Sequence, residues 1–268
     1  MVRSKLIAAF AIVGVALTST ASADIVIDDF DGPIGGQKAA DLEANSLNTL
    51  VTVEGLPVLG GSRKLVADTT VGSGDANGIK VEANASGASG ILAFDQANST
   101  YAGTGHLIYD GSTTENGGGA NVPINTAGLP GLDLSGGGIL DSFVLEDLVV
   151  TGSGLELTVN LFDATTGGIL TSGIQALTNG FKGNLHLPYA SFTGEASALS
   201  NLGALQVFID GRNVTGSDLV IGRLASTGNT PPPAVPEPSS LALAALASLG
   251  GLGYRLRRKK VEEKTAAA

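Results

Sequence analysis

Two histidines, His106 and His186, are the side chains of this sequence best suited to acid–base chemistry near neutral pH. Neither lies in a Gly-x-Ser-x-Gly elbow or a His-Glu-x-x-His pair, the patterns that would join it to a nucleophile or a metal. His186 alternates with Leu185 and Leu187, so we expect it to face solvent, and His106 follows Gly105 at the start of an expected strand. We therefore interpret both as ordinary surface or strand histidines.

The absence of cysteine excludes thiol catalysis, disulfides and cysteine-based metal sites. Glycosidases use a pair of carboxylates, but the spacing of the 25 acidic residues singles out no such pair. The sequence therefore predicts no catalytic residue and a protein that is not an enzyme. An unrecognised glycan hydrolase is the least favoured alternative.

Asp28, Asp29 and Asp31 form a carboxylate cluster near the start of the chain. Calcium takes several carboxylate and carbonyl oxygens, so the cluster is a candidate structural Ca²⁺ site, and no other cofactor is indicated. The alternative is a turn over residues 29–32, in which aspartate hydrogen-bonds to the backbone two residues on. No EF-hand spacing is present, and we favour the turn.

Aromatic residues bear on sugar binding, because exposed tryptophan or tyrosine combines an apolar ring with a polar tip. The chain has no tryptophan and four tyrosines. Tyr189 is in phase with Leu185 and Leu187 and is expected in the core. Tyr101 and Tyr109 remain as candidates for a polar, loop-borne sugar site.

Short alternating segments are expected to position these residues. In Leu155–Leu161 apolar and polar side chains alternate strictly, as in a half-buried strand, and Ile79–Ala83 follows the same pattern. Leu205, Val207 and Ile209 share one face of another expected strand. Further strands are predicted at Ile25–Asp29, Leu50–Glu54, Lys64–Asp68, Gly90–Asp95, His106–Asp110, Ser142–Val150, Asn184–Leu187 and Asp218–Leu224.

Many short strands joined by glycine-rich turns predict an all-β fold, built as a sandwich or a barrel. One short helical turn is expected at Ala39–Ser46. The proline-rich segment 227–235 is expected to be a stiff linker. We therefore predict a single β-sandwich ectodomain at residues 24–226.

Residues 1–23 have the chemistry of a secretory signal peptide, with a basic start and an apolar stretch before Ala21-Ser22-Ala23. We expect signal peptidase to cut after Ala23, which makes Asp24 the first exported residue. A retained N-terminal anchor is the alternative, although the apolar stretch is short for a membrane span.

The end of the chain contains a Pro-Glu-Pro motif, an uncharged apolar segment and a basic cluster. The segment at about 240–254 consists mainly of Leu, Ala and Gly and would cross a membrane as a helix. The basic cluster is expected to keep this end cytoplasmic, with residues 261–268 as a tail. The cluster contains Arg255, Arg257, Arg258, Lys259 and Lys260.

The order of these three parts, at residues 236–260, resembles the PEP-CTERM sorting signal of exported proteins in Gram-negative bacteria that make extracellular polysaccharide. The resemblance implies that an exosortase recognises Val235, Pro236, Glu237 and Pro238 and removes the anchor near them. The opening segment 27–31 and the segments 187–192, 202–211 and 218–221 resemble a jelly-roll family common among such proteins. That resemblance implies a jelly-roll-like sandwich.

Charge favours an extracellular role. Residues 24–230 contain seven basic and 22 acidic residues, a net charge near −15, and an acidic surface disfavours nucleic acid. We expect export through the inner membrane, transient anchoring with a cytoplasmic C-terminus, and final location at the cell surface or in the extracellular matrix. The expected function is a structural or interaction role in association with extracellular polysaccharide. The alternative is a carbohydrate-binding module.

Overall fold

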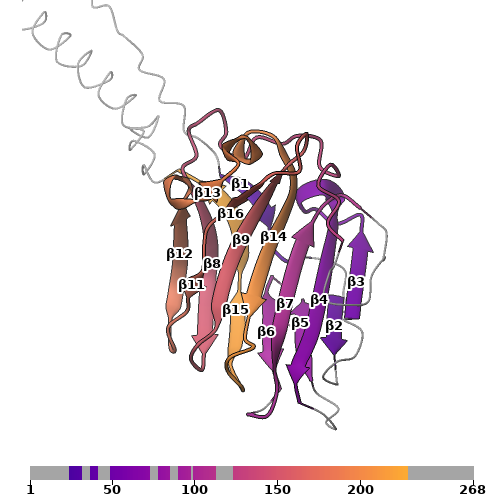
Figure 1. Cartoon of the computed structure of the whole chain (residues 1–268), viewed down its shortest axis with the longest axis vertical. Helices are drawn as coiled ribbons and strands as arrows, with labels where there is room; N and C mark the ends of the chain where they lie inside the picture. The colour runs from indigo at the N-terminus through magenta and orange to yellow at the C-terminus, as the bar shows by residue number, and fades with distance from the viewer. Residues whose placement is uncertain are drawn as a thin grey trace, which may run out of the picture. The chain divides into compact units, whose positions relative to one another are not determined.

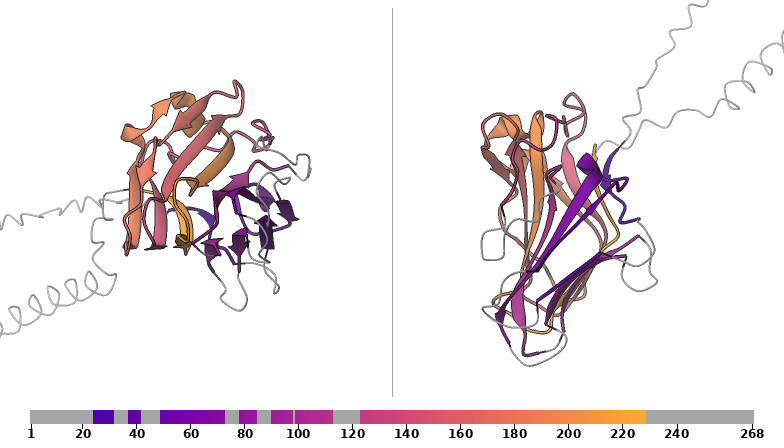
Figure 2. Two further views of the ribbon diagram at one scale, coloured as in Figure 1. Left: turned by 60° about the horizontal axis from the view of Figure 1, so that its bottom comes forward. Right: turned by 90° about the vertical axis from the view of Figure 1, so that its right-hand side faces the viewer.

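The computed structural model describes residues 24–31, 37–41, 49–72, 78–84, 90–97, 99–112 and 123–228. Within these ranges the chain forms two sheets, each paired antiparallel throughout, that pack face to face (Figure 1). Figure 2 shows the two layers from other directions. The prediction of an all-β sandwich is therefore confirmed.

Sheet A is organised around β8, which pairs with β12 along one edge and with β16 and then β15 along the other. β16 continues to β1, and β15 continues to β6, β5 and β2. The strands are β1 (Ile25–Asp28), β2 (Gln37–Asp41), β5 (Ile79–Ala83), β6 (Leu92–Gln96), β8 (Ser142–Thr151), β12 (Lys182–Pro188), β15 (Asp218–Ile221) and β16 (Arg223–Thr227).

Sheet B has β14 at its centre, between β9 and β7. β10 and β11 pair with the far edge of β9, and β4 and β3 extend the sheet beyond β7. The strands are β3 (Thr49–Glu54), β4 (Ser62–Val71), β7 (Ala102–Tyr109), β9 (Glu156–Asp163), β10 (Ile169–Thr171), β11 (Gln175–Ala176), β13 (Thr193–Gly194) and β14 (Leu202–Asp210). Short 3₁₀ turns lie at η1 (Leu59–Gly61), η3 (Tyr189–Ser191) and η4 (Ala196–Leu199).

The core lies between the sheets and follows the predicted alternation. Leu157, Val159 and Leu161 of β9 are fully buried, as are the three apolar residues predicted to share a face of β14. The intervening residues of both strands therefore lie on the outer side of sheet B, because side chains alternate across a strand. Hydrophobic burial stabilises the sandwich, and the same alternation fixes which polar residues face outward.

The helical turn predicted at Ala39–Ser46 is wrong for its described part. Residues 37–41 form β2, which pairs residue by residue with β5 and buries Gln37, Ala39 and Asp41. Alanine has the highest helix propensity, but cross-strand pairing with β5 overrides that local preference. Residues 42–48 lie outside the described ranges.

The strand predicted at Asp218–Leu224 is two strands. It breaks at Gly222, where an added Cβ would lie 2.9 Å from the Cβ of Asp147. Asp147 has a φ of 51°, the geometry of a bulge in β8. β16 then continues to Thr227, the first residue of the predicted linker.

Candidate functional site

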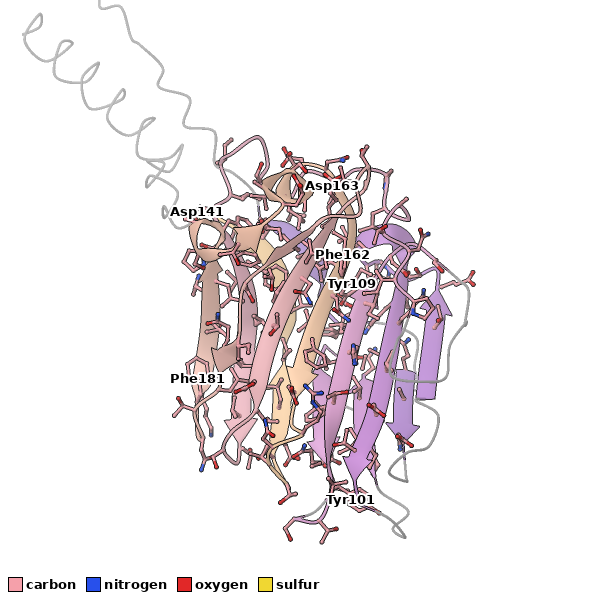
Figure 3. All side chains as sticks on the ribbon, viewed as in Figure 1. Tyr101, Tyr109, Asp141, Phe162, Asp163 and Phe181 are labelled. Atoms are coloured by element: carbon pink, nitrogen blue, oxygen red, sulfur yellow. The ribbon has the colours of Figure 1, made fainter. Side chains whose placement is uncertain are left out.

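The tyrosines proposed for a loop-borne sugar site are core residues, and that hypothesis is wrong. Tyr101 and Tyr109 are both fully buried (Figure 3). Tyr109 occupies an inward position of β7, where its hydroxyl donates to Asp28 Oδ2 at 2.5 Å. Tyr189 is buried, as predicted, and its hydroxyl donates to Ser226 Oγ at 2.6 Å.

Asp28 belongs to a polar cluster enclosed between the sheets. Its Oδ2 lies 3.1 Å from Arg63 Nε, and its Oδ1 accepts the Phe30 amide at 2.7 Å. Arg63, 2% exposed, also lies over the Phe30 ring, 5.4 Å from its centroid. Burial raises the pKa of Asp28, and the charge of Arg63 opposes that rise. Both carboxylate oxygens are thus engaged by protein groups.

The other two aspartates of the cluster are joined by the local hydrogen bond that the predicted turn requires, and Gly32, the last residue of that turn, lies outside the described ranges. The Asp31 amide donates to Asp29 Oδ1 at 3.1 Å. Among the residues that the structure describes, no three His, Asp or Glu side chains are placed to hold a metal ion. The calcium hypothesis for Asp28, Asp29 and Asp31 stays a prediction, which melting of the purified chain with and without a chelator would test.

A second set of polar side chains covers the outer side of sheet B, and we call it the polar face. The strand register places its members in three adjacent rows. The first row contains Asn160 and Gln206, the second Thr158, Phe208 and His106, and the third Glu156, Asp210, Thr104 and Asp68.

Hydrogen bonds connect the first row to the second through Gln206 and His106, and the second row to the third through His106 and Thr104. Asn160 Nδ2 donates to Gln206 Oε1 at 3.0 Å, so the amide NH₂ of Gln206 faces His106 Nδ1, also at 3.0 Å. Nδ1 must therefore accept, and the imidazole proton resides on Nε2, 3.4 Å from Thr104 Oγ1. Burial lowers the pKa of His106 to about 4, so the ring is neutral at pH 7.

This arrangement makes His106 unsuited to general-base catalysis. Its Nδ1 is already occupied by Gln206, its Nε2 carries the proton, and a base with a pKa near 4 drives proton removal poorly at pH 7. The prediction that His106 is a strand histidine is confirmed, although it lies inside a polar network. His186 is exposed on β12, as predicted.

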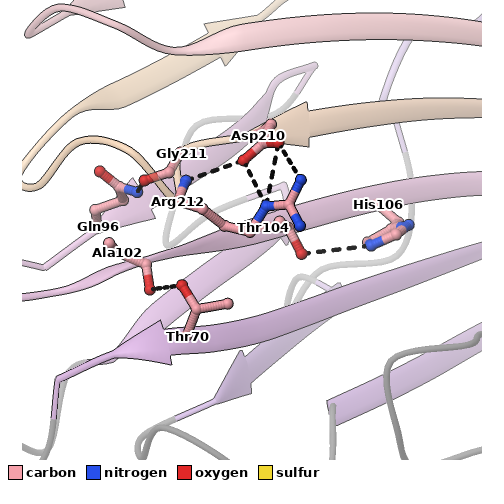
Figure 4. A network of polar contacts seen from close by, with 8 residues as sticks. All are labelled: Thr70, Gln96, Ala102, Thr104, His106, Asp210, Gly211 and Arg212. Carbon is pink, nitrogen blue, oxygen red and sulfur yellow. Dashed lines mark hydrogen bonds and ion pairs between the residues drawn. The ribbon is translucent and has the colours of Figure 1, made fainter.

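Arg212 lies at one end of the polar face. Its Nε and Nη2 both donate to the Asp210 carboxylate, at 2.5 to 3.1 Å (Figure 4). This fork lowers the pKa of Asp210 and raises that of Arg212. The guanidinium also lies over the Phe208 ring at 6.0 Å, and that ring packs against His106 at a centroid distance of 4.8 Å.

Gln96 of sheet A fixes the turn that presents Arg212. Its Nε2 donates to the Gly211 carbonyl at 2.8 Å (Figure 4). Its Oε1 accepts the Ser217 amide at 3.1 Å. An added Cβ on Gly211 would lie 2.2 Å from Gln96 Nε2 and would displace that side chain, so this contact favours glycine. The position of Arg212 therefore depends on a contact between the two sheets.

Several polar atoms of the polar face have no partner among the described residues. These atoms are the Thr158 hydroxyl, Asn160 Oδ1 and Arg212 Nη1. The Arg212 side chain is 52% exposed, whereas Asp210 is 12% exposed. The polar face can thus donate to and accept hydrogen bonds from a polar ligand without rearranging its own network.

Sequence reasoning missed Asn160, Gln206, Phe208 and Arg212 as site residues. The signal was present, because the alternation predicted outward-facing polar positions in β9 and β14. It did not reveal that these two strands are neighbours and that β7 lies on the other side of β14.

Most of the predicted processing residues lie outside the described ranges. They are Ala21, Ala23, Val235, Pro236, Glu237, Pro238, Arg255, Arg257, Arg258, Lys259 and Lys260. Asp24 is described, and its Oδ2 lies 3.6 Å from Arg223 Nη2. No helix among the described residues has the length and apolarity of a membrane span.

Comparison with known protein families identifies a motif near the C-terminal end of the chain. The family model for the PEP-CTERM protein-sorting motif matches residues 234–259. The chain therefore carries a PEP-CTERM sorting motif, as the resemblance implied, and this motif implies an exported protein. The matched segment includes Val235 to Pro238 and ends one residue before Lys260.

Solved structures similar to this chain include sugar-binding and sugar-cleaving proteins. The family 11 carbohydrate-binding module of the Clostridium thermocellum cellulase Lic26A-Cel5E has 11% identity and a TM-score of 0.37, with 78% of this chain and 97% of that chain covered. The same organism's family 11 module bound to a mixed-linked tetrasaccharide has 13% identity and a TM-score of 0.34, covering 77% and 98%. An exo-β-agarase has 9% identity and a TM-score of 0.34, covering 78% and 25%. No curated protein sequence matches significantly.

Proposed function

We propose that this chain is an exported, non-catalytic protein that associates with extracellular polysaccharide through the polar face of sheet B. The observation that carries the proposal is the hydrogen-bonded series Asn160–Gln206–His106. Beside it, the Phe208 ring has Thr158 opposite it in the register and the Arg212 guanidinium over it, both with unengaged polar atoms. Sugars present closely spaced hydroxyls and apolar C–H faces, which amide, imidazole and guanidinium groups beside a ring can contact.

The sorting motif supports the same proposal, because it implies delivery to the outside of the cell. The geometry of His106 supports a non-catalytic role, since the ring has neither a free basic nitrogen nor a poised nucleophile. A rigid sheet is also a suitable platform for weak, repeated contacts along a polymer, because its side chains need little ordering on binding.

Retention of the purified full-length chain in mild detergent on immobilised polysaccharide tests this function. Suitable polymers are polysaccharide from the producing organism, mixed-linked β-glucan and agarose. We expect retention that free polymer competes away, and a weakening of at least tenfold in the double variant Asn160→Ala/Phe208→Ala. His186→Ala, on sheet A, is the matched control and should bind like the wild type.

Absence of retention on every polymer, or equal retention of the double variant, would overturn the polar face as a binding site. Shortening of the polymer during incubation would overturn the non-catalytic assignment. Size-exclusion chromatography of the incubated polymer measures that shortening directly.

We further propose that the chain is processed at both ends. Signal peptidase would produce Asp24 as the first residue, and an exosortase would remove the apolar segment 240–254 near Pro236-Glu237-Pro238. Intact mass from extracellular and membrane fractions of the native host checks this. A species from Asp24 to the Pro-Glu-Pro motif is expected, and a species reaching Ala268 in the extracellular fraction would contradict it.

A further inference from the structure

The third row of the polar face concentrates negative charge. Glu156, Asp210 and Asp68 occupy this row on β9, β14 and β4, with only Thr104 between the last two. Asp68 and Glu156 both interact electrostatically with Arg212, which lies among them. One cation therefore stands against three carboxylates at this end of the face.

The cations available to the face are already paired. The seven basic residues between residues 24 and 230 all lie in described ranges. Of these seven, only Lys64 and Arg212 are on the outer side of sheet B. Lys64 Nζ is buried and donates to Asp110 Oδ2 at 2.8 Å and to Ser112 Oγ at 3.1 Å. Arg212 is held by Asp210 through three N–H···O contacts. A bound anion would thus reach the Arg212 guanidinium only beside the Asp210 carboxylate that already balances its charge.

The remaining polar groups of the face are uncharged. Thr158, Asn160 and Gln206 are neutral by chemistry, and the hydrogen bond from Gln206 keeps His106 in its neutral tautomer. Such groups match hydroxyls, which donate and accept, better than carboxylates or sulfates, which only accept and carry charge.

From this charge arrangement we propose that the polymer bound by the polar face is a neutral polysaccharide, and that polyuronates and sulfated glycans are rejected. The inference rests on the proposed function and specifies its ligand class. Rejection has a direct physical cause, since a carboxylate or sulfate placed on the third row would face three negative charges while desolvating its own.

The test compares polymers that differ only in charge. Mixed-linked β-glucan and agarose are each used in native form and after oxidation of their primary hydroxyls to carboxylates. We expect the native forms to bind the full-length chain at least tenfold more tightly than the oxidised forms at 50 mM salt. The difference should shrink at 500 mM salt, because screening shortens the range of the repulsion.

A variant pair shows whether the third row causes the selectivity. Asp210→Asn frees the Arg212 guanidinium, and we expect the ratio of native to oxidised affinity to fall at least fivefold. Asp95→Asn removes the same charge from the outer side of sheet A and should leave the ratio within twofold of the wild type. Equal effects of the two variants would overturn the assignment to the third row.

The failure outcomes are distinct. Equal or tighter binding of the oxidised polymers at 50 mM salt overturns the neutral-polymer inference and leaves glycan binding by the face intact. If no polymer is retained in either form, the proposed function fails and the inference falls with it.

Discussion

The two polar clusters of this protein use similar residues on the two sides of one sheet. Arg63 and Tyr109 point inward from β4 and β7 and enclose Asp28, and none of the three is more than 2% exposed. On the outer side, the polar face combines His106, Gln206 and Arg212 at partial exposure. Both clusters have polar atoms without a hydrogen-bond partner, but Arg63 Nη1 of the enclosed cluster is buried, whereas Arg212 Nη1 belongs to a side chain that is 52% exposed. Exposure to solvent, rather than polarity or unused hydrogen-bonding capacity, therefore separates a structural cluster from a candidate site.

The largest expected effect breaks the enclosed cluster. Arg63→Met leaves the buried Asp28 carboxylate without its cation, and loss of one partner of a buried pair costs about 3–5 kcal/mol of unfolding free energy. Arg212→Met on the polar face should cost under about 1 kcal/mol, because its pair is solvated. Urea unfolding measures both, and similar losses would contradict the distinction.

Two further measurements sharpen that result. Adding Asp28→Asn to Arg63→Met removes the uncompensated charge and should recover at least half of the loss. The loss in Arg63→Met should also be greater at pH 8 than at pH 5. Without Arg63 the already raised pKa of Asp28 rises further, and stability linked to a raised folded-state pKa is lost as the pH rises through that pKa.

The second expected effect concerns His106 on the polar face. The folded-state pKa of His106, about 4, is below its unfolded value of about 6.5, so its contribution is full above pH 6.5 and is lost as the pH falls toward 4. Between pH 7 and 4.5 the wild type should lose about 2 kcal/mol more than His106→Gln. If the unfolding free energies of the wild type and His106→Gln changed in parallel with pH, the lowered pKa of His106 would be contradicted. His186→Gln, which replaces an exposed histidine in the same way, is the control.

The third expected effect is the loss of stability when one buried hydrogen bond, between Tyr189 and Ser226, is removed. Tyr189→Phe removes the donor to Ser226 Oγ and should cost about 1 kcal/mol. Ser226→Ala should cost somewhat more, because that hydroxyl also donates to the Leu134 carbonyl at 2.6 Å. Thermal melting of both variants and their combination measures the coupling, and strictly additive losses would contradict a direct bond.

The smallest expected effect on stability belongs to the polar face. Thr158→Val keeps the shape of a side chain whose hydroxyl has no partner among the described residues, so stability should change by less than about 0.5 kcal/mol. Retention on neutral polysaccharide should weaken about threefold, as for one lost hydrogen bond. A destabilised variant with unchanged retention would place Thr158 in the enclosed class instead.

Alternation in the sequence predicted much of the fold. It assigned Leu155–Leu161 and Ile79–Ala83 to strands with the correct side inward, because a half-buried strand needs apolar residues at every second position. It failed at Ala39–Ser46, where β2 depends on its partner β5, and at Gly222, where a bulge in β8 interrupts the pairing. Both failures arise from neighbours far away in the sequence.

By itself the sequence determined the all-β class and the sorting motif, since both are local patterns of residue type and spacing. It did not determine which tyrosines are exposed, and Tyr101 and Tyr109 proved to be buried. Only the tertiary structure set β14 between β9 and β7, and only that order brings Asn160, Gln206 and His106 into hydrogen-bond contact. The physical reason is that strand order is decided by packing and pairing over long sequence separations, for which no local pattern exists.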